Sequence, residues 1–173
     1  MNRLQRLAPD TLRLERHFDA PVETVWKWIA DPELRQQWFA GGTKAEHVGS
    51  FELAFDHDQL SADPVPYPPQ YASHKGHVAK LKILRIDPPR LLEFDWAGGK
   101  EGIVTIELAA QGAGTHLVLT HRGISGPGPM SDFGGGWTSH LDVLRTKLSG
   151  GVVRDFWALH LQSIAAVKAQ LGN

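Results

Sequence analysis

The sequence predicts an α+β fold in which a curved antiparallel sheet of about seven strands wraps around a long C-terminal helix, followed by one extra terminal helix. Short segments of alternating polarity, separated by tight turns, favour antiparallel strands. The stretch 134–150 predicts the long helix, because glycines stand at both of its ends and set its limits. Within it, large apolar residues recur at steps of four, three and four and share one face: Trp137, Leu141, Leu144 and Leu148.

The composition indicates one domain, residues 1–173, with a core at about 11–150 and a helical extension at 151–173. A net charge of −1 argues against binding to nucleic acid or to an acidic membrane surface. The absence of cysteine excludes disulfides, thiolate catalysis and cysteine-based zinc sites, and it fits a reducing compartment. No stretch is as apolar as a signal peptide or a membrane span, so we expect a cytoplasmic protein.

The first predicted strand is 11–18, in which Leu12, Leu14 and Phe18 point to one side. Arg16 falls on that apolar side. It is either a strand-end charge that snorkels to water or a buried charge with a partner, and the first interpretation is favoured.

Two short helices are expected next. Pro21 suits the first position of a helix whose apolar stripe includes Trp26. Asp31 is the expected N-cap of a second helix, which ends near Gly41.

The segment 43–56 is interpreted as two strands that turn near Gly49. Residues 59–73 are polar and contain four prolines, so we expect a long loop without helix or strand. With little to bury, this loop is the predicted most mobile segment and a candidate lid. Four further strands follow: 76–86, 91–96, 102–109 and 115–122.

The last predicted helix, 152–171, carries a continuous apolar face. That face must be covered by the chain itself or by a second copy. We favour the second copy, and hence a homodimer.

Several motifs resemble one known superfamily. The opening Arg16-His-Phe-Asp-Ala-Pro21, with Asp31-Pro-Glu33 and Trp38-Phe39, is similar to the start of SRPBCC (START-like) proteins. The strand Pro88-Pro-Arg-Leu-Leu-Glu-Phe-Asp-Trp96 and the pair Gly136-Trp137 resemble those of homologues of the activator of heat-shock protein 90 ATPase. Phe156-Trp157-Ala-Leu-His160 resembles a tail that some bacterial members carry. The resemblance implies a helix-grip fold with an elongated apolar cavity between sheet and long helix.

We therefore expect a small apolar or aromatic molecule as the ligand, bound in that cavity without a cofactor. Six tryptophans in 173 residues are many, and stiff rings with few polar groups suit such a ligand. Each ring taken alone is also explained by core packing. Trp137 is the strongest single candidate. The candidate ligand-binding residues are Trp26, Trp38, Phe39, Phe51, Phe55, Phe94, Trp96, His121, Trp137, His140, Leu141 and Leu144.

His121 and His140 are the candidate acid–base residues, since both are expected to point inward. The favoured interpretation is a neutral buried histidine held by a backbone group, because no nucleophile stands at a readable spacing. Asp56-His57-Asp58 and His74-x-x-His77 flank the proline-rich loop, but their spacing matches no known zinc pattern, so no metal is expected.

Two other functions stay open. One is an enzyme of the cyclase, aromatase or dehydratase type that uses the same cavity. The other is a chaperone-regulating protein-interaction module. A histidine paired with a carboxylate inside the cavity would favour the enzyme, and a broad exposed apolar patch would favour the module.

Overall fold

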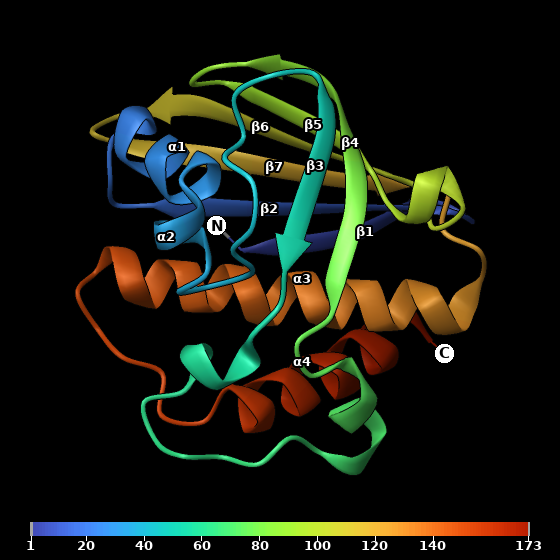
Figure 1. The fold of residues 1–173 in the computed structure, drawn as a ribbon. Coiled ribbons are helices and arrows are strands. Elements are labelled where there is room, and N and C mark those ends of the chain that lie inside the picture. The colour runs from blue at the N-terminus through green and yellow to red at the C-terminus, as the bar shows by residue number, and fades with distance from the viewer. Residues whose placement is uncertain (1, 173) are drawn as a thin grey trace.

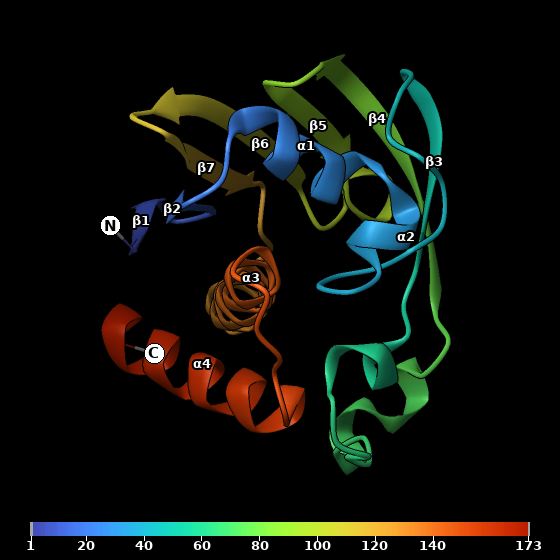
Figure 2. The same ribbon diagram turned by 90° about the vertical axis from the view of Figure 1, so that its left-hand side faces the viewer.

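The structure, a computed structural model, describes residues 2–172, which form one antiparallel sheet and two long helices beneath it (Figure 1). The strands lie side by side in the order β1-β2-β7-β6-β5-β4-β3. Figure 2 shows the sheet curving over the helices α1 (Val22–Ala30), α2 (Pro32–Arg35) and α3 (Pro127–Leu148). Helix α4 (Phe156–Leu171) lies on the side of α3 away from the sheet. The predicted helix-grip fold is confirmed. The strands are β1 (Arg3–Ala8), β2 (Thr11–Phe18), β3 (Gly49–Ala54), β4 (Val78–Asp87), β5 (Leu91–Asp95), β6 (Ile103–Gln111) and β7 (Gly114–Arg122).

The seven strands are not the seven that the sequence predicts. Strand β1 was missed because its alternation is weak: Leu4 is buried, but Leu7 is 55% exposed. The predicted strand at 43–48 is wrong. The chain pairs with β3 earlier, where the Gly41 and Thr43 amides each donate 2.9 Å hydrogen bonds to β3 carbonyls. Gly42 permits this approach, because a Cβ there would lie 2.1 Å from the Glu52 carbonyl oxygen.

The snorkelling interpretation of Arg16 is also wrong. Its side chain is buried, with Nε 3.9 Å from an Asp142 carboxylate oxygen on α3. One guanidinium nitrogen donates a 2.9 Å hydrogen bond to the Glu15 carbonyl oxygen. Arg16 is therefore a buried charge with a partner, and it links β2 to α3.

Helix α3 begins at Pro127, seven residues before the predicted start. The glycine run 134–136 does not limit the helix but lies inside it, where α4 crosses. A Cβ on Gly134 would lie 2.8 Å from Val167 Cγ1, and one on Gly135 would lie 2.7 Å from Ile164 Cα. The glycines are needed for the close approach of the two helices, not for a helix end.

The helix pair α1–α2 is held by one buried cation. Asp31 caps α2 as predicted, accepting a 2.8 Å hydrogen bond from the Glu33 amide. Arg35 is buried and donates to five backbone carbonyls, and its guanidinium lies 5.1 Å from the centre of the Phe51 ring. The accepting residues are Ile29, Ala30, Ala40, Gly41 and Thr43.

The helix crossing gives a matched pair of substitutions. Gly135→Ala should destabilise the protein by about 1–3 kcal/mol, because the new methyl group overlaps the α4 backbone. Gly136→Ala should be neutral or stabilise by up to about 1 kcal/mol, since alanine is the better helix former. The nearest atom to a Cβ there, His160 Cε1, is 3.9 Å away. Urea unfolding measures the free energy of unfolding of both variants. Equal changes would contradict the close approach of α4 to Gly135.

Arg35→Met should cost about 3–5 kcal/mol, because it leaves several buried carbonyls without a donor. The control is Arg90→Met, which removes an exposed arginine 3.8 Å from Asp87. That change should stay within about 0.5 kcal/mol. Thermal unfolding of both variants compares them, and similar melting temperatures would refute the structural role of Arg35.

Candidate functional site

The space between the sheet and α3 is filled. Only about 10 Å³ remains there, between rings that include Trp38, Phe51 and Phe94. That volume is about the space of one water molecule. The elongated cavity implied by the resemblance is therefore absent at this place, because the aromatic side chains pack against one another.

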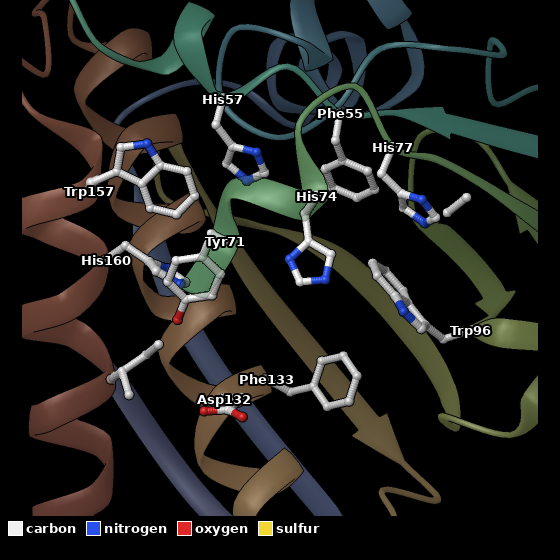
Figure 3. Close-up of a pocket in the computed structure, with 12 residues that line it drawn as sticks. Phe55, His57, Tyr71, His74, His77, Trp96, Asp132, Phe133, Trp157 and His160 are labelled. Carbon is white, nitrogen blue, oxygen red and sulfur yellow. The ribbon is translucent and has the colours of Figure 1, made fainter. Parts of the chain in front are cut away.

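A pocket of about 470 Å³ lies beside this core, between α4, the N-terminal half of α3, the segment 55–79 and the end of β5 (Figure 3). An adjoining hollow of about 120 Å³ shares part of its wall and reaches inward to Phe39, Trp137 and His140. The larger pocket is lined by Phe55, His57, Tyr71, His74, His77, Ala79, Trp96, Asp132, Phe133, Trp157, His160 and Ile164.

The structure divides the twelve candidate ligand-binding residues into two groups. Phe55 and Trp96 line both spaces, whereas Phe39, Trp137 and His140 line the smaller one. The other seven are buried and line neither: Trp26, Trp38, Phe51, Phe94, His121, Leu141 and Leu144. Sequence reasoning missed Tyr71, Phe133, Trp157 and His160 as wall residues. The Phe156–His160 motif was visible, but no periodicity places the terminal helix over the pocket.

The segment 59–73 is not the structureless loop that the sequence predicts. It joins two short 3-10 helices, His57–Leu60 and Pro69–His74. Leu60 is buried, and the Ala62 amide donates a 2.8 Å hydrogen bond to the Val153 carbonyl just before α4. The segment therefore has a buried side chain and a backbone contact with the chain before α4, which its proline content did not indicate. High mobility and a lid role stay predictions.

Helix α4 is covered by its own chain. Its Trp157 stacks on Tyr71 at 5.0 Å between ring centres and lies 5.0 Å from the His57 ring. On the other side, Ile164 and Val167 pack over the glycines of α3. The covered face removes the argument on which the predicted homodimer rested.

His121 is a satisfied core residue. The Trp137 indole N–H donates a 3.1 Å hydrogen bond to His121 Nδ1, so Nε2 carries the proton and donates to the Glu101 carbonyl oxygen at 2.7 Å. Burial lowers the pKa of His121 to about 4. Both ring nitrogens are occupied, as the favoured interpretation expects of a neutral histidine held by the backbone.

His140 is held in a similar way. Its Nδ1 lies 2.8 Å from the Trp38 carbonyl oxygen, which only accepts, so Nδ1 is the donor. Burial, together with the neighbouring His57, lowers the pKa of His140 well below its usual value. His140 is therefore a neutral side chain at physiological pH.

Two polar atoms beside the pocket form no hydrogen bond although they are buried: His57 Nδ1 and Trp157 Nε1. Burial, together with nearby His160, lowers the pKa of His57 to about 4. An unsatisfied buried donor or acceptor costs about 1–3 kcal/mol. Each such group in a native protein calls for an explanation, such as an ordered water or a ligand at the site.

The pocket histidines form neither a metal site nor a catalytic pair within the described residues. His57, His74 and His77 do converge on the pocket, but residues 2–172 contain no group of three suitable side chains that could hold a metal ion. Asp132 lines the same pocket as His160, and no histidine–carboxylate hydrogen bond is found among the described wall residues. Across the same range, no helix is long and apolar enough to cross a membrane.

Fold and pocket define a helix-grip domain with a ring-lined pocket at the side of its long helix. A family model, "Activator of Hsp90 ATPase homolog 1-like protein", matches residues 19–149, and the chain belongs to this family of SRPBCC-type proteins. No curated protein matches the chain.

Solved structures share the fold. The protein encoded by gene BPP1335 of Bordetella parapertussis is 37% identical, with a TM-score of 0.79, over 95% of this chain and 87% of that one. CalU16 from Micromonospora echinospora is 23% identical, with a TM-score of 0.67, over 100% and 98% of the two chains. DynU16, from the dynemicin biosynthetic locus, is 22% identical, with a TM-score of 0.65, over 86% of this chain and 51% of that one. For the last two, the likeness concerns the fold alone.

The buried histidines predict that stability depends on pH. The folded pKa values of His57, His121 and His160 lie at about 4, below the ordinary value of 6.5. Between these values the unfolded chain binds more protons, so the free energy of unfolding should fall as the pH drops from about 6.5 to about 4. Each histidine contributes up to about 1.4 kcal/mol per pH unit in this window.

Urea unfolding at several pH values between 5 and 7.5 measures that slope. His121→Asn should lower stability at neutral pH and also flatten the slope, because one of the shifted groups is gone. A free energy of unfolding that stays constant from pH 7 to pH 5 would contradict the prediction.

Proposed function

We propose that this protein binds a small aromatic molecule in the pocket between α4, the segment 55–79 and the sheet. The observation that carries the proposal is the pocket itself. Its volume of about 470 Å³ suits a small ligand, and aromatic rings form most of its wall. The core between the sheet and α3, by contrast, leaves only about 10 Å³, so the proposed site lies outside it.

The rings are held in place before any ligand arrives. Phe133 meets the Trp96 ring edge to face at 6.0 Å between centres, and Phe55 lies 6.4 Å from the same indole. Opposite them, Tyr71 and Trp157 are stacked. Walls that are already ordered lose little side-chain freedom on binding, which favours affinity for a flat apolar ligand.

Binding is favoured over the two alternatives. An enzyme of the cyclase, aromatase or dehydratase type would be supported by a histidine–carboxylate pair, and the described pocket wall has none. A chaperone-regulating surface would be supported by a continuous apolar patch. The large exposed apolar residues are instead distributed over β1, β4, α4 and two loops.

Two half-buried tryptophans give a matched test. Trp96 lines the pocket and Trp28, on α1, does not. Trp96→Ala should weaken binding of 2-methoxynaphthalene by roughly tenfold or more, because it removes one wall of the site. Trp28→Ala should leave the affinity unchanged. Calorimetric titration measures both, after circular dichroism has shown that each variant folds.

No measurable binding of this probe to the parent protein would overturn the proposal, as would equal loss in both variants. Consumption of the bound compound, followed by chromatography, would move the assignment to an enzyme.

A further inference from the structure

His160 has one ring nitrogen that forms no hydrogen bond within the described chain, and its side chain lines the larger pocket. It lies on α4, is 8% exposed and extends toward the pocket behind Tyr71 (Figure 3). Its Nδ1 lies 3.0 Å from Ser139 Oγ. No hydrogen bond is found for Nε2, which is not among the buried unsatisfied atoms and is therefore reachable from the pocket.

The Ser139 hydroxyl determines which nitrogen carries the proton. Ser139 Oγ also lies 3.0 Å from the Gly136 carbonyl oxygen, to which it donates its one hydrogen. Both contacts are hydrogen bonds only if His160 Nδ1–H donates to Ser139 Oγ. The proton then sits on Nδ1, and Nε2 presents a lone pair. Burial lowers the pKa of His160 to about 4, so the ring is neutral at physiological pH and the lone pair stays available.

The charged residues around the pocket also disfavour an anionic ligand. Asp132 contributes a carboxylate whose charge raises the pKa of both His160 and Tyr71. At His160 this opposes the effect of burial, whereas at Tyr71 burial also raises the pKa. No lysine or arginine lines the pocket in the described part of the chain. The nearby Lys75 is bound to Asp58 at 3.0 Å. The wall thus offers a negative charge and a neutral acceptor, but no fixed cation for an anionic ligand.

We propose that the pocket selects an aromatic ligand that carries a hydrogen-bond donor, such as a phenol hydroxyl, which donates to His160 Nε2. This inference rests on the proposed function and adds the ligand's chemical class. Aromatic carboxylates are disfavoured, because Asp132 repels them and His160 has no proton to give at Nε2. Ethers of the same ring bind through the rings alone and lack the hydrogen bond.

Three naphthalene probes test the preference on the parent protein, without any variant. 2-Naphthol should bind roughly 3- to 10-fold more tightly than 2-methoxynaphthalene, the gain of one net hydrogen bond. 2-Naphthoate should bind most weakly. Calorimetric titration at pH 7 gives the three dissociation constants.

Variants assign the preference to His160. His160→Leu should make the dissociation constants of 2-naphthol and 2-methoxynaphthalene equal. His160→Gln, whose amide oxygen can take the place of Nε2, should keep part of the preference. Ser139→Ala should reduce it, since the tautomer is no longer fixed. Circular dichroism controls for folding.

The outcomes separate the two proposals. If none of the probes binds, the proposed function fails and this inference fails with it. If all three bind equally, or the ether or naphthoate binds best, the pocket stands as a ring-binding site and the donor preference is wrong. A preference that survives in His160→Leu also overturns the assignment.

Discussion

The close crossing of α3 and α4 is the contact on which the candidate site depends. Two glycines in the middle of α3 let the α4 backbone approach until Ile164 and Val167 occupy the space of their missing side chains. A glycine in a helix costs about 1 kcal/mol relative to alanine, so this approach must be offset by packing. The crossing positions the first turns of α4, where Trp157 and His160 face the segment 57–77 across the pocket (Figure 3).

In this arrangement the proposed site lies beside the interior that the sheet and the long helix enclose, not within it. A curved sheet over a long helix encloses an interior, but here large rings close it, and Trp137 and His121 hydrogen-bond to each other within it. Trp96 and Phe55, which follow β5 and β3, instead line the pocket that α4 closes on its other side. The rings between the sheet and α3 mainly stabilise the fold, and the pocket is formed between α4 and the segment 55–79.

Much of the fold could be predicted from the sequence, because periodicity reports which residues are buried. The alternation in β2 and the spacing from Trp137 to Leu148 both describe one face of one element. The errors arose where the answer depends on contacts between distant segments. Gly134 and Gly135 are read as a helix end unless α4 is known to cross them, and Arg16 is read as exposed unless Asp142 is known to face it. The candidate site was predicted only in part for the same reason. Alternation within one strand identified Phe55 and Trp96 as inward rings, whereas the orientation and tautomer of His160 depend on Ser139, which lies on another helix.

The origin of the pocket wall limits what the family can tell about the ligand. The family match ends at residue 149, and α4 begins at Phe156. Trp157, His160 and Ile164 therefore come from chain outside the matched region, and they face residues of the segment 57–77 inside it. The matched region supplies strands β3 to β7, α3 and the aromatic floor of the pocket, while the terminal helix supplies the opposite wall, including His160. The pocket proposed as the ligand site therefore depends on a helix that lies outside the matched region, so the family match alone does not define its wall.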